Sequence, residues 1–327
     1  MEKQFDTKKL IEFAVKAPSG HNTQPWRFIV RDREIQIHPD LTRILPVVDS
    51  DNHALYIGLG CAAENIVIAA KKYGVKSLVS ISTSIKNDDF IKIQFPADNP
   101  EQYDELVDFI DKRQSTRNEY RLEKISTSDL TSLQSSFLFE GVDLLTFTSS
   151  EEIKILEPFI IEGSNQQFHN KKFVSELIDW FRFSEKEANE KADGLRAACM
   201  GLPKMNRFIG KIVMKYFVSA KSEAKRWKKL IDKSAGFALF AASKNDVQHW
   251  VALGRAFQRF ALTATKLNIS HAHANMPCEE LEVRKKLITQ LKLETKHPLL
   301  IIRFGYSNKM PYSFRRNVNE VIVSNGL

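Results

Sequence analysis

The chain reads APSGHNTQPW at residues 17–26, between a predicted helix and a predicted strand. Pro18 and Pro25 stiffen this loop because the proline ring fixes φ, and Gly20 allows another backbone segment or a ligand to approach closely. Such a loop can present three polar side chains to a planar polar ligand: Ser19, Asn22 and Gln24. The alternative is an ordinary capped loop in which these side chains bond only to neighbouring backbone groups.

Around this loop, hydrophobic spacing predicts a mixed chain of helices and strands. Before residue 100 the expected elements are helix 10–17, strands 26–30 and 34–37, helix 53–73 closed by Gly74, and strands 78–81 and 90–93. A polar stretch at 97–104 then reads as a linker. Beyond it we expect helices 103–110, 128–135, 151–161 and 249–267, strands 142–146 and 299–304, and a short strand or tail at 318–323. Residues 171–234 form a helix-rich insert with little strand character.

Two long apolar helices suggest that the chain contains two related halves. Residues 57–66 loosely resemble residues 252–260, since both place Gly and Ala early in an apolar helix that is followed by a strand. The division falls near residue 100. It gives a first half, residues 1–100, with the polar loop, and a second half, residues 101–327, with the insert 171–234.

Composition excludes several classes of protein. Hydrophobic residues make up 43% of the chain and charged residues 27%, which is typical of a globular protein, and the length gives material for roughly two domains of ~150 residues. The first residues lack the apolar segment of a secretory signal, and no apolar run approaches the ~18 residues of a spanning helix. The three distant cysteines form no CxxC pair, so we expect no disulfide framework, no zinc site and a reducing, cytoplasmic location.

Positive charge is concentrated in one part of the chain. The net charge is +8, and residues 204–233 contain ten Lys and Arg against Glu223 and Asp232. A basic helix of this kind can meet nucleic acid, an anionic membrane or an anionic cofactor, or it can be a solvated surface. We favour a lid or packing on the core over an amphipathic membrane helix at 209–231, and we expect no nucleic-acid partner.

The polar loop resembles a family signature. Residues 17–26 are similar to the APSxxNxQPW motif of the nitroreductase family of FMN enzymes, and most similar to its Acg-like subgroup. The family's Arg-x-Ser-x-Arg cluster, which is usually N-terminal, has its counterpart after the linker in RQSTR at 113–117. RFGY at 303–306 and SFRR at 313–316 resemble the family's late run. The resemblance therefore extends over nearly the whole chain, with the insert as its weakest part.

This resemblance implies an α+β, nitroreductase-like fold. Family members hold FMN between two subunits, and Acg-like members resemble such a dimer fused into one chain, so we expect a pseudo-dimer that is a monomer or a weak homo-oligomer. A second flavin site would need matching motifs near residues 5–9 and 135–139, and neither is present. We therefore predict one flavin per chain, with the insert as a lid over it.

The resemblance also implies which residues bind the cofactor. Arg113 and Arg117 stand four positions apart, the spacing of one helical turn, with Ser115 between them, and guanidinium groups bind a phosphate dianion through bidentate bonds. Arg315 and Arg316 can close the same pocket from the C-terminal side. The alternative for the arginines is a surface charge cluster. The complete cofactor-binding prediction is Pro18, Ser19, Gly20, Asn22, Gln24, Arg113, Gln114, Ser115, Arg117, Asn275, Arg315 and Arg316.

Other motifs carry less weight. GLGCAA at 58–63 matches the GxGxxA dinucleotide fingerprint, but no clear strand precedes it, so we read it as small residues that allow close backbone approach. His271 and His273 form an HxH pair without a third ligand, and we predict no metal. His21 is a candidate proton donor, although a loop hydrogen bond is the favoured role. We predict no essential catalytic side chain.

The sequence thus predicts an FMN-dependent oxidoreductase. NADH or NADPH reduces the flavin, and a nitroaromatic, a quinone or another small acceptor is then reduced; the flavin supplies the chemistry and the protein supplies binding and orientation. The rival interpretation is an FMN-binding, sequestering protein whose lid stays closed, with little or no turnover. Both interpretations share every motif above and differ in access to the flavin.

Overall fold

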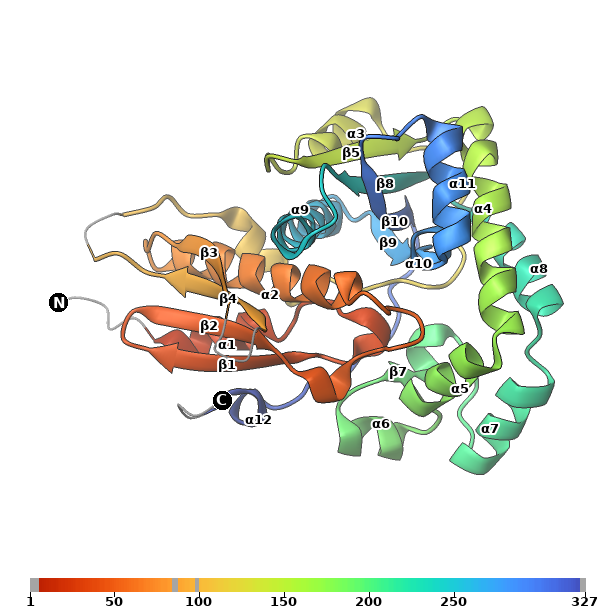
Figure 1. The fold of residues 1–327 in the computed structure, drawn as a ribbon, viewed down its shortest axis with the longest axis horizontal. Helices are drawn as coiled ribbons and strands as arrows, with labels where there is room; N and C mark the ends of the chain where they lie inside the picture. The colour runs from red at the N-terminus through yellow and green to blue at the C-terminus, as the bar shows by residue number, and fades with distance from the viewer. Residues whose placement is uncertain (1–5, 84–87, 98–99, 324–327) are drawn as a thin grey trace.

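The computed structural model describes residues 6–83, 88–97 and 100–323, which form two four-stranded antiparallel sheets and their helices (Figure 1). The first sheet has the order β1-β2-β4-β3 and consists of β1 (Trp26–Arg31), β2 (Glu34–Pro39), β3 (Leu78–Thr83) and β4 (Asp89–Gln94). The second has the order β5-β8-β10-β9 and consists of β5 (Val142–Phe147), β8 (Gly236–Ala242), β9 (Ser270–His273) and β10 (His297–Gly305). The α+β class predicted from the sequence is confirmed.

Two long helices lie between the sheets. α2 (His53–Lys72) packs on the first sheet, α9 (Val247–Lys266) packs on the second, and the two helices pack on each other (Figure 1). Their backbones touch at two glycines, because a Cβ at Gly60 would lie 2.3 Å from the carbonyl oxygen of Val251, and one at Gly254 would lie 2.1 Å from that of Ile57. Close packing through small residues at 58–63 is therefore confirmed.

Polar side chains fix the same helix pair. Glu64 of α2 is 1% exposed, and its carboxylate accepts hydrogen bonds from Arg255 at 2.8 Å and Arg259 at 2.9 Å on α9. Beside it, the amide of Gln258 donates to the side-chain oxygen of Asn65 at 2.6 Å. A buried carboxylate is tolerated when it is fully paired, so a shift of one helix along the other would leave a buried charge without a partner.

The second sheet is covered on both faces. All seven residues of β8 are buried: Ala238 and Phe240 pack in the cluster that contains α9, whereas Phe237 and Leu239 pack with α4 (Ser150–His169), α8 (Ala220–Asp232) and α11 (Leu281–Leu291). β8 is absent from the strands predicted from the sequence. Its run GFALFAA lacks the alternation that marks a half-exposed strand.

The remaining described elements are short. They are α1 (Thr7–Ala14), α3 (Thr127–Gln134), α5 (Lys171–Trp180), α6 (Glu185–Lys191), α7 (Arg207–Tyr216), α10 (Met276–Glu279), α12 (Val318–Val321), the strands β6 (Phe181–Arg182) and β7 (Leu195–Arg196), and the 3-10 turns η1 (Gly20–Asn22), η2 (Leu41–Arg43), η3 (Glu105–Phe109) and η4 (Ala197–Met200). Residues 171–234 are helix-rich, as predicted. The considered helix 209–231 is two helices, because Ser219 forms a capping box with Ser222 and starts α8 anew.

Several predicted elements need correction. Residues 318–323 contain helix α12, because the side chain of Asn317 accepts the amide of Asn319 and caps a helical turn where the β-branched residues suggested a strand. Residues 105–109 form a 3-10 turn in place of a longer helix, and α1 ends at Ala14. α4 extends to His169, beyond the predicted 151–161. Within the predicted linker 97–104, residues 98 and 99 lie outside the described residues.

α2 is long and apolar enough to cross a membrane by length and composition alone, and among the described helices it alone meets that criterion. Its most apolar window is 94% buried inside the protein. In this fold α2 is a core helix that supports the first sheet on one side and α9 on the other.

Gly60→Ala is expected to destabilise the protein by about 1–3 kcal/mol, because the added Cβ meets a backbone carbonyl that cannot turn away. Gly58→Ala on the same helix is the matched control. Its Cβ meets its nearest neighbours at 3.5–3.7 Å, and alanine is favoured over glycine in a helix by roughly 0.5–1 kcal/mol. Urea unfolding measures both free energies, and equal values would contradict the close helix contact.

Candidate functional site

A cavity lies beside the N-terminal turns of α2. The segments that line it are 18–22, 45–61, 113–117, 195–200, 273–279 and 311–315, with Phe257 of α9 and Leu300 of β10. The polar loop identified in the sequence therefore meets residues almost three hundred positions away. The cavity is enclosed by both sheets' helices, by the insert and by the C-terminal segment.

The loop at 17–26 has an unusual backbone. Three of its non-glycine residues have positive φ: His21 at 48°, Asn22 at 57° and Gln24 at 54°. Each such conformation costs free energy and persists only where the surroundings hold it, which is common at ligand sites. The hydroxyl of Ser19 helps to keep the loop in this conformation, because it accepts a hydrogen bond from the backbone amide of Gln24 at 2.9 Å.

Three arginines in the cavity wall have no carboxylate partner within the described residues: Arg113, Arg117 and Arg315. Arg113 is buried and donates one bond, to the carbonyl of Lys16 at 2.9 Å, while its Nε and Nη1 have no partner in the described part of the chain. Arg315 donates to the side-chain oxygen of Asn22 at 2.9 Å and to backbone carbonyls, and its Nε has no partner. Arg117 makes no hydrogen bond to any described residue.

Burial disfavours the charged form of all three guanidinium groups. It lowers the pKa of Arg113 to about 10 and that of Arg315 to about 9, and it also lowers the pKa of Arg117. Positive charge within the group adds to this effect, since Arg117 lowers the pKa of Arg113, and Arg113 and Arg117 lower the pKa of Arg315. Uncompensated cations that face a cavity, with free N–H donors, fit an anion with several acceptor oxygens.

The segment 113–117 is extended and not helical. Ser115 forms an isolated parallel bridge with His271 of β9, and the amide of Thr116 donates to the carbonyl of His271 at 2.8 Å. The prediction that Arg113 and Arg117 lie one helical turn apart is therefore wrong. Pairing with the edge of the second sheet holds the two arginines at the cavity instead.

Residues 192–200 of the insert lie against the polar loop. The amide of Gly194 donates to the carbonyl of Asn22 at 3.1 Å, and the side chain of Asn22 donates back to the carbonyl of Gly194 at 3.1 Å. Asp193 is buried and ion-paired with Arg43 and, at 2.7 Å, with Arg182. Since residues 195, 199 and 200 also line the cavity, this segment covers part of it.

Acidic residues line the part of the cavity near α2. The carboxylate of Asp49 accepts the amides of Ala54 at 2.9 Å and Leu55 at 2.8 Å, so it caps the start of α2. Glu279 accepts bonds from Gln167 at 2.7 Å and Asn275 at 3.2 Å. Burial raises the pKa of both carboxyl groups. Both carboxylates therefore already accept hydrogen bonds from other groups of the protein.

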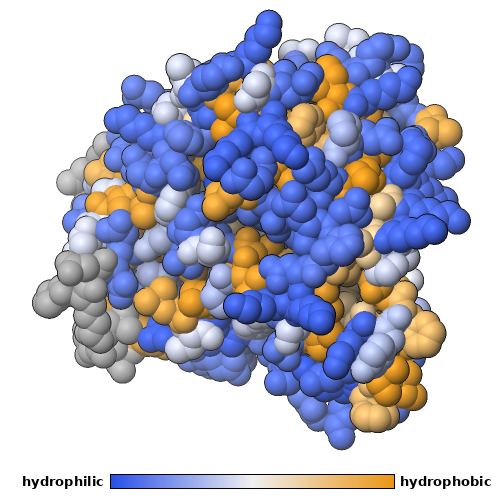
Figure 2. All heavy atoms as spheres, turned by 45° about the vertical axis from the view of Figure 1, so that its right-hand side comes forward, coloured by the Kyte–Doolittle hydropathy of each residue, from blue (hydrophilic) through white to orange (hydrophobic). Residues whose placement is uncertain are grey.

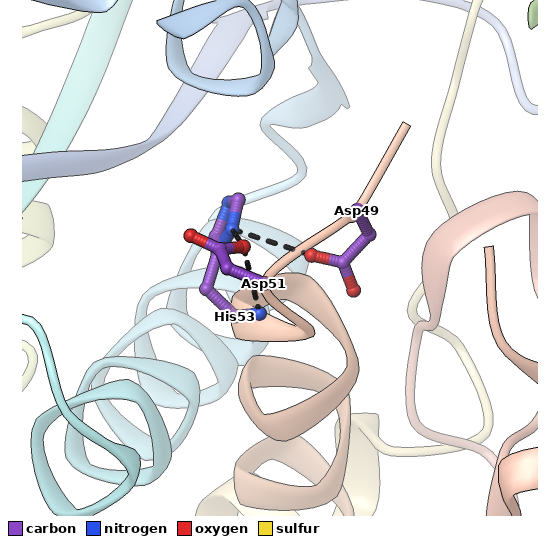
Figure 3. A group of neighbouring side chains, drawn as sticks. All are labelled: Asp49, Asp51 and His53. Carbon is purple, nitrogen blue, oxygen red and sulfur yellow. Dashed lines mark hydrogen bonds and ion pairs between the residues drawn. The ribbon is translucent and has the colours of Figure 1, made fainter. Parts of the chain in front are cut away.

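Asp49 belongs to a cluster with Asp51 and His53, whose side chains turn toward one another (Figure 3). The Nδ1 atom of His53 lies 2.5 Å from Asp51 and 3.2 Å from Asp49. Burial opposes the charged form of Asp51, but the hydrogen bond from His53 lowers its pKa to about 2. The residue types could hold a metal ion. However, the Asp49 oxygens are occupied by backbone amides and Arg284 lies 3.9 Å from Asp51, so the geometry is that of a helix cap.

The cavity histidines are held neutral. Burial and, secondarily, the charge of Arg117 lower the pKa of His21 to about 4 and that of His273 to about 3. Burial lowers the pKa of His271 well below its ordinary value, and neither of its ring nitrogens has a partner among the described residues. Both β9 histidines pack edge-on against Phe257, so they share a face of the strand. His273 thus offers a neutral ring to the cavity, a position that the sequence had marked only as part of an HxH pair.

Most of the predicted cofactor-binding residues line this cavity. They are Pro18, Ser19, Gly20, Asn22, Arg113, Gln114, Ser115, Arg117, Asn275 and Arg315. Gln24 and Arg316 do not: the side-chain oxygen of Gln24 accepts the amide of Arg316 at 2.8 Å, and its side-chain nitrogen donates to the carbonyl of Ala192. They support the loop from outside.

Two of the lining residues are also engaged with the protein. The side chain of Gln114 accepts the backbone amide of Met310 at 2.7 Å and donates to its carbonyl at 3.0 Å. Asn275 accepts the amide of Ile301 at 2.9 Å. The sequence analysis did not assign Asp49, Cys199 and Glu279 to the site, because no local motif marks them.

No family model matches the chain. A relative from Mycobacterium tuberculosis named "Putative NAD(P)H nitroreductase Rv3131" is 21% identical, over 96% of this chain and 90% of the relative. "Putative NAD(P)H nitroreductase acg" from the same organism is 31% identical over 72 residues, 22% of each chain. The resemblance to the nitroreductase family, including Acg, is confirmed.

Solved structures of similar fold align with about two thirds of the chain. A nitroreductase-like family protein from Bacillus cereus aligns with 69% of this chain and 99% of its own, at 12% identity and a TM-score of 0.42. An iodotyrosine deiodinase bound to FMN and 3-iodo-L-tyrosine aligns with 68% of this chain and 99% of its own, at 12% identity and a TM-score of 0.44.

We expect the free energy of unfolding to fall as pH drops below about 6.5, the ordinary histidine pKa. His273 has a lowered pKa in the folded state, so between about pH 6.5 and its folded value the unfolded chain binds more protons, and acid favours unfolding. His273→Gln removes one such group and is expected to flatten the slope by up to about 1.4 kcal/mol per pH unit. Urea unfolding between pH 7 and pH 5 measures this, and an unchanged slope would refute a neutral, buried His273.

Proposed function

We propose that this protein binds one FMN per chain in the cavity and acts as an NAD(P)H-dependent oxidoreductase of the nitroreductase type. The observation that carries the proposal is the convergence of Arg113, Arg117 and Arg315 on the cavity without a carboxylate partner among the described residues. A phosphate dianion offers the missing negative charge and accepts bonds from the free guanidinium N–H groups.

Other residues of the cavity wall suit the flavin ring of the same cofactor. The polar loop brings Pro18, Ser19 and Gly20 to the wall, and Gly58 offers a wall without a side chain, as a flat ring system needs. When bound, FMN accepts a hydride from a nicotinamide and passes the electrons to an acceptor. The protein's own part is to neutralise the phosphate, orient the ring and exclude water through residues 192–200.

The chain is proposed to be a fused pseudo-dimer, with residues 1–100 and 101–327 as its halves. One half contributes β1 to β4 and the polar loop, the other contributes the segment 113–117 and the second sheet, and α2 packs on α9 between them. The site then combines the loop of one half with the arginines of the other. A nitroaromatic, a quinone or a similar small molecule is the proposed acceptor, and a cytoplasmic location is proposed with it.

A second candidate function has a specific observation in its favour. Residues 192–200 are fastened over the polar loop by the mutual Asn22–Gly194 hydrogen bonds and by the buried Asp193 between Arg43 and Arg182. If this segment stays in place with FMN bound, the protein sequesters the flavin and turns over little. Access of a nicotinamide decides between the two functions.

Arg117→Gln is expected to weaken FMN binding by about 10–150-fold, because a hydrogen bond to a charged group contributes roughly 1.5–3 kcal/mol. Riboflavin, which lacks the phosphate, should bind both proteins equally. Arg117 suits this test because it makes no hydrogen bond to a described residue, so its loss leaves no protein group unpaired. Fluorescence titration measures both affinities, with the exposed Arg121→Gln as control. An equal loss for FMN and riboflavin would place the phosphate elsewhere.

Anaerobic NADPH or NADH is expected to bleach the flavin absorption of the purified FMN complex. A flavin that dithionite reduces and neither nicotinamide reduces would support sequestration instead. Asp193→Asn then provides the discriminating variant, since it weakens the ion pairs that hold residues 192–200. It should make a sequestered flavin reducible by nicotinamide, and a protein without FMN after reconstitution would refute both functions.

A further inference from the structure

The outer face of α7 exposes a row of large apolar side chains. Phe208 and Tyr216 are 74% and 69% exposed, and Ile209 and Ile212 are 48% and 38% exposed. Their spacing places them on one stripe of the helix, and Phe217, 73% exposed, continues it past the helix end. An apolar cluster stands out at the lower right of Figure 2, where α7 lies.

The opposite face of α7 is packed against the protein, so the helix cannot rotate to bury the exposed stripe. Gly210 and Met214 are buried, and a Cβ at Gly210 would lie 2.1 Å from the ring of Phe183. The asparagine at the start of the helix, Asn206, accepts the amide of Ile209 and fixes the first turn. The helix therefore has two apolar faces, one packed on the insert and one without cover.

Basic residues lie on the helix that carries the uncovered face and on the helix that follows it in the chain. Lys211 and Lys215 stand on α7 itself, and Lys221 and Lys225 follow on α8; none of the four has a carboxylate within ion-pair distance among residues 6–83, 88–97 and 100–323. Over residues 204–233 the chain carries ten Lys and Arg against two acids. A surface that is both apolar and negatively charged would complement this face.

We propose that the outer face of α7 docks on an anionic lipid surface. Phenylalanine, isoleucine and tyrosine side chains enter the boundary between acyl chains and head groups, while the lysines lie at the level of the acidic head groups. A second copy of the chain fits less well. Across a two-fold axis the patch would meet itself, so lysines would face lysines, and a helix of ten residues, about 15 Å long, is short for a stable interface of about 800 Å² per partner.

The segment that carries this surface follows the cover of the cavity closely in the chain. Cys199 and Met200 of η4 line the cavity, and α7 begins seven residues after Met200. Leu202, between them in the chain, is another exposed apolar side chain, at 49%. A short stretch of chain thus links the residues that line the cavity to the helix proposed to meet the lipid.

Sedimentation with phosphatidylcholine vesicles, with and without phosphatidylglycerol, tests the proposal on the full chain. We expect binding only to the acidic vesicles, and less at high salt. Phe208→Ser with Ile212→Ser should lower partitioning at least about tenfold, and Lys211→Gln with Lys215→Gln about 25-fold, or ~fivefold per lysine. Leu138→Ser, at a side chain 98% exposed elsewhere, is the matched control and should bind as the wild type does.

Three results would overturn the proposal: no sedimentation with acidic vesicles at low salt, binding that none of the α7 variants changes, or binding that Leu138→Ser lowers equally. Light scattering measures the oligomeric state and so tests whether a second copy of the chain covers this face. A wild-type dimer that Phe208→Ser converts to a monomer, without lipid binding, would assign the face to a second copy. Because Phe208 is exposed, unchanged thermal unfolding of the variants excludes misfolding as the cause.

Discussion

The packing of α2 on α9 is the constraint on which the rest of the structure depends. Gly60 and Gly254 bring the two backbones into contact, and the buried Glu64 between Arg255 and Arg259 fixes the register. Each helix carries one of the two sheets, so this contact determines where the polar loop at 17–26 stands relative to the arginines at 113–117. A small shift between the helices would separate the two sets of residues that form the cavity.

The cavity combines two features that cost stability. Three positive φ values occur within four residues of the loop, and three guanidinium groups lie together without a carboxylate partner among the described residues. The loop is held by side chains from distant segments: Arg315 donates to Asn22, and Gln24 bonds to Arg316 and Ala192. These supports restrain the backbone and leave the cations uncompensated. An anionic ligand would remove the electrostatic cost, so its binding and the stability of the fold are coupled.

Local motifs in the sequence predicted the parts of the site that lie on one segment. The loop at 17–26 and the arginines at 113 and 117 were recognised because the residues stand next to one another in the chain. Asp49, Cys199 and Glu279 reach the cavity through tertiary packing and leave no local signal. Gln24 and Arg316 were predicted to touch the ligand because they lie in the right motifs, but neither motif reveals that the side chain of Gln24 bonds to the backbone amide of Arg316. Similarly, the sequence did not predict β8, because a strand that is buried on both faces lacks the alternation of apolar and polar residues.

The insert shows why composition alone could not separate its roles. Residues 204–233 are uniformly basic and rich in apolar side chains, yet the structure divides them. In α8, Trp227, Leu230 and Ile231 are buried against the second sheet's outer helices, as core packing predicts. In α7 only part of the apolar surface packs on Phe183 and its neighbours, and one apolar stripe stays exposed to solvent. The break at Ser219 lets the two helices take different directions. One basic segment can therefore support the fold with one helix and offer a surface with the other, within reach of the residues that close the cavity.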